Sequence, residues 1–177
     1  MRAAIPILGA LMLLAWAPTQ AHAIVPCIKE HRLVNEFIDE DTGNRGRIKY
    51  QAVMTEIPPP GPQFETDGQL ALLDVVTGKR LALTWAAVSD SEPLAHASYL
   101  AAVDAALFKG GGSATGITLR RVDLRGRAKF ATDDLLRILA LVASSYGAIG
   151  GPDYAGAILD VAGELKITLP DLMQRPR

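Results

Sequence analysis

Residues 69–88 restrict the fold of this chain more than any other segment, because they predict two strands joined by a tight turn. The two β-prone runs, 69–76 and 79–88, are separated only by Thr77 and Gly78, a sequence typical of a β-hairpin. The second run has large apolar residues at one parity and smaller ones at the other. The first run is apolar at both parities, which predicts a central strand covered on both faces or nearly so.

Two further segments are expected to add strands to this hairpin. In residues 47–54, apolar side chains alternate with basic or polar ones, as in a half-buried strand. Several prolines follow, so residues 57–68 are expected to form a stiff surface connection. Residues 117–124 are apolar at one parity before Arg120 and at the other after Arg121. A β-bulge at these arginines would return all the apolar side chains to the core side, because one extra residue reverses the facing.

Three later segments carry helix signals. Ser91 is a suitable N-cap for a helix that runs to about Lys109 and stops at Gly110. Thr132 is expected to cap a strongly apolar helix at the centre of the core, and Pro152 to open a third helix with one buried face. The expected fold class is therefore α+β, with a mainly antiparallel sheet of about four strands covered by about three helices.

The N-terminal residues have the organisation of a cleavable signal peptide. A positive charge precedes an apolar run over residues 3–16, and Ala-His-Ala follows at 21–23. We expect residues 1–23 to be removed and residues 24–177 to form a single globular domain, with a loose tail after about residue 170. The apolar run is shorter than the roughly 20 residues that span a bilayer. The mature chain is expected to be periplasmic or secreted and to have no transmembrane span.

Composition limits how the domain is stabilised and what it binds. The chain has one cysteine, so no intramolecular disulfide can form, and stability must come from burial of its 49% hydrophobic residues. A net charge of −1 gives no general attraction for nucleic acid, which is not an expected partner. No motif indicates a cofactor, and the few sulfur and imidazole groups do not reach the four ligands of a structural zinc site.

Cys27, His31 and His96 are the candidate catalytic residues. The spacing of Cys27, His31, Val34 and Ile38 places them on one stripe of a short helix, although a strand is nearly as plausible. On a helix, Cys27 and His31 would be neighbours able to form an activated nucleophile or to bind a soft metal. The alternative is a half-buried cysteine beside a surface histidine.

His96 lies on the apolar stripe of its expected helix. A structural role in the core is the simpler interpretation. A catalytic role would need a carboxylate partner such as Asp90, Glu92 or Asp104, and a nucleophile such as Ser98 or Cys27.

A basic cluster is the candidate surface for an anionic partner. Its members are Arg120, Arg121, Arg125, Arg127 and Lys129. Such a cluster can bind an anionic glycan, a lipid headgroup or an acidic protein. The alternative is a solvated strand edge, where basic residues also deter aggregation.

The function expected from the sequence is therefore that of an exported, non-enzymatic binding or accessory protein that acts on a protein or another envelope component. The alternative is a small hydrolase or a metal- or redox-dependent protein that uses Cys27 with His31 or His96. The two hypotheses differ in whether these three side chains meet in one cleft.

Overall fold

A computed structural model describes residues 27–38, 45–57, 63–108, 110–126 and 132–169. Within these residues the chain forms one five-stranded antiparallel sheet and three helices. In chain order the elements are β1 (Ile28–Ile38), β2 (Arg45–Ile57), β3 (Gln63–Asp74), β4 (Arg80–Ser89), α1 (Glu92–Ala106), β5 (Ile117–Gly126), α2 (Thr132–Gly150) and α3 (Pro152–Glu164). The expected α+β class is confirmed, with five strands in place of about four.

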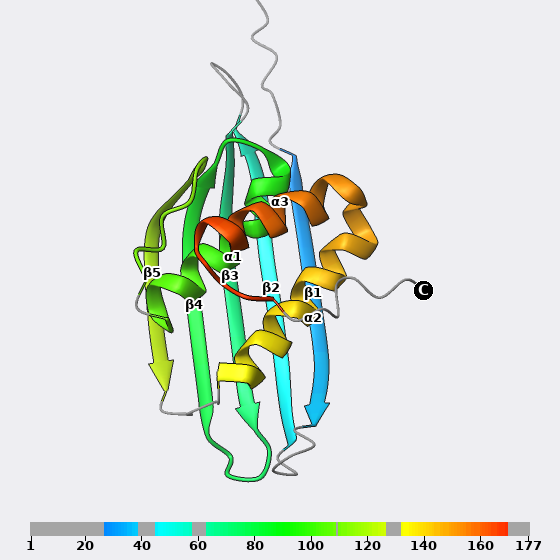
Figure 1. Ribbon diagram of the computed structural model, residues 1–177, viewed down its shortest axis with the longest axis vertical. Coiled ribbons are helices and arrows are strands. Elements are labelled where there is room, and N and C mark those ends of the chain that lie inside the picture. Colours follow the sequence, from blue (N-terminus) through cyan, green and yellow to red (C-terminus); the bar gives the residue numbers. More distant parts are fainter. Residues whose placement is uncertain (1–26, 39–44, 58–62, 109, 127–131, 170–177) are drawn as a thin grey trace, which may run out of the picture.

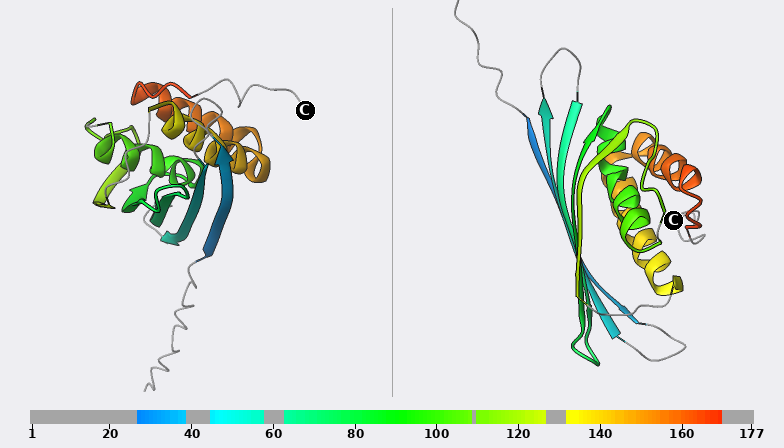
Figure 2. Two further views of the ribbon diagram at one scale, coloured as in Figure 1. Left: turned by 90° about the horizontal axis from the view of Figure 1, so that it is seen from below. Right: turned by 90° about the vertical axis from the view of Figure 1, so that its left-hand side faces the viewer.

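The domain has two layers, a twisted sheet and a layer of helices on one of its faces (Figures 1 and 2). The strands lie side by side in chain order, so every strand pairs with its sequence neighbour. Helix α1 packs against β3, β4 and β5, while α3 packs against both α1 and α2. The core lies between these layers, and all three helices of the described residues lie on this one face of the sheet (Figure 2).

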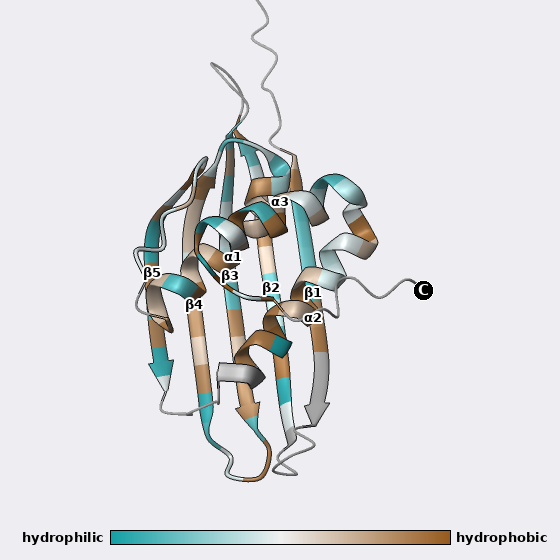
Figure 3. Cartoon of the chain, viewed as in Figure 1, coloured by the Kyte–Doolittle hydropathy of each residue, from teal (hydrophilic) through white to brown (hydrophobic). Residues whose placement is uncertain are grey.

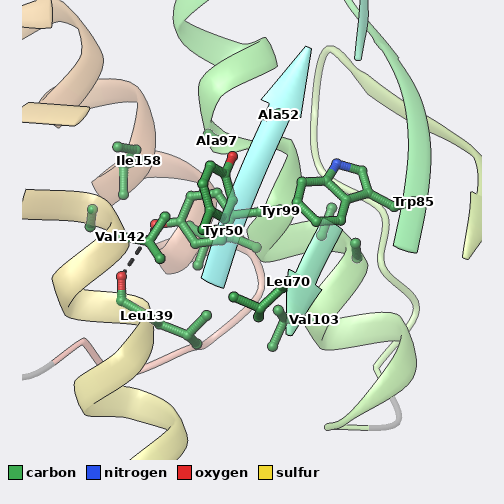
Figure 4. Close-up of a cluster of buried hydrophobic side chains, with 14 of the residues drawn as sticks. Tyr50, Ala52, Leu70, Trp85, Ala97, Tyr99, Val103, Leu139, Val142 and Ile158 are labelled. Atoms are coloured by element: carbon green, nitrogen blue, oxygen red, sulfur yellow. Dashed lines mark hydrogen bonds between the residues drawn. The ribbon is translucent and has the colours of Figure 1, made fainter. Parts of the chain in front are cut away.

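Alternation along the strands produces this one-sided core (Figure 3). The alternate residues Ile48, Tyr50, Ala52 and Met54 of β2 are all buried, and Leu81, Leu83, Trp85 and Ala87 repeat the pattern on β4. Tyr50, Tyr99 and Trp85 gather where the sheet meets the helices (Figure 4). The Trp85 ring lies over Gly68 of β3, where a Cβ would come within 2.1 Å of it. Only glycine therefore fits at this position.

The bulge expected in β5 is present. Ala86 and Ala87 of β4 pair with Arg121 and Leu119, so Arg120 is the extra residue. The apolar residues on either side of it pair with residues of the buried parity of β4, as expected. The hairpin of β3 and β4 and the Ser91 N-cap are likewise confirmed, although the connection spans residues 75–79 instead of Thr77 and Gly78 alone.

Three local expectations are wrong. Residues 28–38 form an edge strand instead of a helix, because they pair along their length with β2. Residues 63–68 belong to β3, because the prolines before them delay the strand without excluding it. β3 is central but covered on one face only, and Ala71 on its outer face is half-buried by its neighbours in the sheet.

Several other expectations fall outside the described residues. These are the signal peptide at 1–23, the start of the mature chain near residue 24 and the tail after 170. The side chain of Thr132, the expected cap of α2, also lies outside them. Among the described residues, no helix is both long enough and apolar enough to cross a membrane.

Candidate functional site

A pocket of about 370 Å³ opens at the β1 edge of the sheet, on the face that carries the helices. Its walls come from β1, β2, the first turns of α1, the end of α2 and the start of α3. The lining residues are Lys29, Glu30, His31, Met54, Glu92, His96, Tyr146, Ile149, Gly150 and Tyr154. Elements distant in the sequence thus meet at one cavity.

Glu92 is the polar centre of this pocket. It occupies the first turn of α1, directly after the N-cap residue, where the helix dipole favours a negative charge. Lys29 Nζ donates to both carboxylate oxygens, at 2.6 and 2.7 Å. Burial by itself raises the pKa of Glu92, but hydrogen bonds from Lys29 and Tyr154 outweigh it, and the resulting pKa is lowered. Glu92 is therefore ionised at neutral pH.

His96 lies one helical turn after Glu92, with its Nε2 3.6 Å from a Glu92 oxygen. Its ring makes edge contacts with the rings of Tyr146 and Tyr154, each at a centroid distance of 4.4 Å. Burial lowers the pKa of His96 to about 4, although the neighbouring carboxylate opposes the shift. The ring is therefore neutral at neutral pH, and its buried Nδ1 has no hydrogen-bond partner among the described residues.

His31 enters the same pocket from β1. Its Nε2 lies 3.0 Å from Ser145 Oγ of α2, and its ring lies 4.3 Å from that of Tyr146. Burial lowers the pKa of His31 as well. Tyr146 thus separates two neutral histidines, and its hydroxyl forms a hydrogen bond with that of Tyr50 beneath the pocket.

The structure brings two of the three predicted catalytic residues together. His31 and His96 contact the same tyrosine, although 65 positions separate them in the chain. Cys27 is exposed and lies directly before β1. A strand rises about 3.3 Å per residue, so the Cα atoms of Cys27 and His31 are about 13 Å apart. The adjacency expected on a helix is lost.

Of the residues suggested as partners of His96, one lies beside it and others lie elsewhere. Glu92 lies beside His96 and so could serve as the carboxylate that a catalytic histidine needs. Asp104 is buried elsewhere and accepts a hydrogen bond from the Gly112 backbone at 2.9 Å. Ser98 bonds to the Trp85 indole inside the core. No group of three or more histidine, cysteine or acidic side chains in the described segments is placed to hold a metal ion.

Sequence reasoning missed four residues of the site, namely Lys29, Ser145, Tyr146 and Tyr154. Both tyrosines carried a signal, because each lies on the apolar stripe of its expected helix. Lys29 and His31 point to the same face only if the segment is a strand. Interpreting the segment as a helix therefore gave no reason to place Lys29 in the site.

The described arginines of the basic cluster face away from the helices, on the other side of the sheet. Arg120 pairs with Glu65, Arg121 lies 3.5 Å from Asp67, and Arg125 pairs with Asp123. Arg127 and Lys129 lie outside the described residues. The three described arginines thus each have a carboxylate within ion-pair distance, which weakens the attraction of this surface for an anionic partner.

Comparison of the chain with protein-family models, with curated proteins and with solved structures finds no match.

Proposed function

We propose that this is an exported binding protein that takes a small organic ligand into the pocket around Glu92. The observation that carries the proposal is the combination, in one cavity, of an ionised, partly buried carboxylate with two neutral histidines. A volume of about 370 Å³ suits a small molecule. Polar groups that converge within largely aromatic and apolar walls are typical of a ligand site.

Binding is favoured over catalysis by the chemistry of the groups. Glu92 is held by its hydrogen bonds to Lys29 and Tyr154. Cys27, the strongest nucleophile in the sequence, is exposed and lies outside the pocket lining. The site therefore offers more for recognition and orientation than for bond cleavage.

The test is a ligand-observed NMR screen of the mature protein with small aryl-alkyl amines, alcohols and carboxylates. Ile149 lines the pocket and is 68% exposed, so Ile149→Trp should fill the mouth without disturbing the core. Leu159→Trp on α3 is the matched control, at an exposed apolar position outside the pocket lining. We expect fragments that bind the parent and L159W but not I149W. Fragment binding that is equal in all three proteins would contradict the proposal.

A second candidate is a small hydrolase, favoured by the hydrogen bond between His31 Nε2 and Ser145 Oγ. In this mechanism Ser145 replaces Cys27 as the nucleophile, and His31 accepts its proton. Ser145→Ala should then abolish release of p-nitrophenol from p-nitrophenyl acetate, while Ala at the exposed neighbour Ser144 should have no effect. Equal rates for the parent and S145A would remove this candidate.

A further inference from the structure

Lys29 and Glu92 form the ion pair at the mouth of the pocket, and the two partners are held very differently. Lys29 reaches in from the edge strand β1 on a flexible stem, and its side chain is 50% exposed. Glu92 is 21% exposed and is fixed by the first turn of α1 and by the hydrogen bond from Tyr154. Exposed lysine pairs contribute little to stability. The ammonium can therefore leave for solvent at small cost, whereas the carboxylate stays in place.

The pocket without the Lys29 ammonium is suited to a cation. Its fixed charge is the Glu92 carboxylate, because Glu30 bonds to Arg32 and Gln51. His31 and His96 are neutral, since burial lowers the pKa of both. An anionic ligand would face the immobile carboxylate, and repulsion between like charges disfavours that arrangement.

The remaining walls favour an organic cation over a bare metal ion. The half-buried ring of Tyr154 lies 4.4 Å from that of His96, and the Tyr154 hydroxyl bonds to Glu92, so one aromatic ring lies beside the carboxylate. Aromatic rings attract ammonium groups. Met54 and Ile149 provide apolar surface for a hydrocarbon part. A metal ion would instead need several oxygen or nitrogen ligands, and the described residues hold no such group.

We propose that the ligand of this pocket carries an organic ammonium group that replaces the Lys29 ammonium on Glu92. This inference rests on the proposed binding function and specifies its ligand class, a small amine with an aromatic or aliphatic body. Lys29 acts as an internal competitor that occupies the carboxylate until the ligand arrives.

The test compares three probes of similar size by isothermal titration calorimetry on the mature protein. The probes are 2-phenylethylammonium chloride, the neutral 2-phenylethanol and the anionic sodium phenylacetate. We expect the ammonium to bind most tightly. Glu92→Gln should weaken its binding by about tenfold or more, since a charge-assisted hydrogen bond is lost.

Lys29→Met provides the distinguishing result. Removing the competitor should strengthen binding of the ammonium by roughly threefold, the scale of an exposed ion pair. Binding of the alcohol should not change. Lys49→Met is the matched control, because Lys49 is exposed on the outer face of β2 and should leave all three affinities unaltered. Since K29M gains affinity, the result does not depend on whether E92Q folds normally.

The possible outcomes separate this inference from the proposed function. If the alcohol binds as tightly as the ammonium and I149W abolishes both, the pocket is a ligand site but the ammonium assignment is wrong. Three other results would also overturn the ammonium assignment. These are tighter binding of phenylacetate than of the ammonium, weaker ammonium binding to K29M than to the parent, and no ammonium binding to the parent or to K29M.

Discussion

At the scale of single residues, His96 makes the site sensitive to pH. Its ring is buried among Tyr146, Tyr154 and the rest of α1, and this burial lowers its pKa to about 4, against 6.5 for an ordinary histidine. The unfolded chain therefore binds a proton below pH 6.5 that the folded chain does not accept until about pH 4. Folding stability must fall across this range, by up to about 3 kcal/mol.

We predict that urea unfolding free energies decrease by about 2 kcal/mol between pH 6.5 and pH 5. The lowered pKa of His31 adds to the loss, while the lowered pKa of Glu92 removes stability only at more acidic pH. A His31→Phe/His96→Phe double variant should show an almost flat profile over this window. A slope as steep in the variant as in the parent would assign the effect to other groups.

At the scale of elements, the β5 bulge is a feature that the sequence pattern alone predicts. The change of apolar parity between Leu119 and Val122 is visible in the sequence, and only one inserted residue reconciles it with a single buried face. Residues 27–38 were misassigned because residues four apart share a face in both a helix and a strand. Pairing with β2 decides between them, and that pairing is a tertiary interaction.

We predict that deletion of Arg120 is tolerated. The deletion converts the bulge into a regular strand and leaves Leu119 and Val122 on the core side, so the unfolding free energy should change by less than about 1 kcal/mol. Deletion of Thr118 in the same strand should cost several times more, because it sends Leu119 to the outer face. Equal losses in guanidinium melts would show that the bulge does not set the facing of β5.

The candidate site could be predicted only in part, because its residues are brought together by tertiary interactions. The sequence singles out His31 and His96, which lie 65 positions apart, but their meeting depends on the packing of α1 and α2 against the sheet edge formed by β1. The same strand geometry separates Cys27 from His31. Lys29 and Tyr154 become functional candidates only once both are seen to bond to Glu92.

At the scale of the whole molecule, a single core joins the sheet to the helices. Leu83 on β4 and Leu139 on α2 are each 1% exposed and belong to the same buried cluster, although they lie in different layers. Tyr99 of α1 contacts both layers, since its ring lies 5.7 Å from that of Tyr50 on β2 and its hydroxyl donates to the Leu139 carbonyl of α2 (Figure 4). The two layers should therefore unfold together.

We predict that Leu83→Ala and Leu139→Ala each lower the unfolding free energy by about 2 to 5 kcal/mol. Circular dichroism and tyrosine fluorescence should report the same single transition for each variant. A loss below about 1 kcal/mol at both positions, or separate transitions for sheet and helices, would contradict a shared core.

The central claim is that Glu92 receives the ammonium of a ligand in exchange for Lys29. A crystal structure of the protein with 2-phenylethylammonium chloride tests this exchange. We expect the ligand nitrogen within about 3 Å of a Glu92 carboxylate oxygen, the phenyl ring between Tyr154 and Met54, and the Lys29 side chain turned into solvent. An intact Lys29–Glu92 pair, with the ligand bound elsewhere, would contradict it.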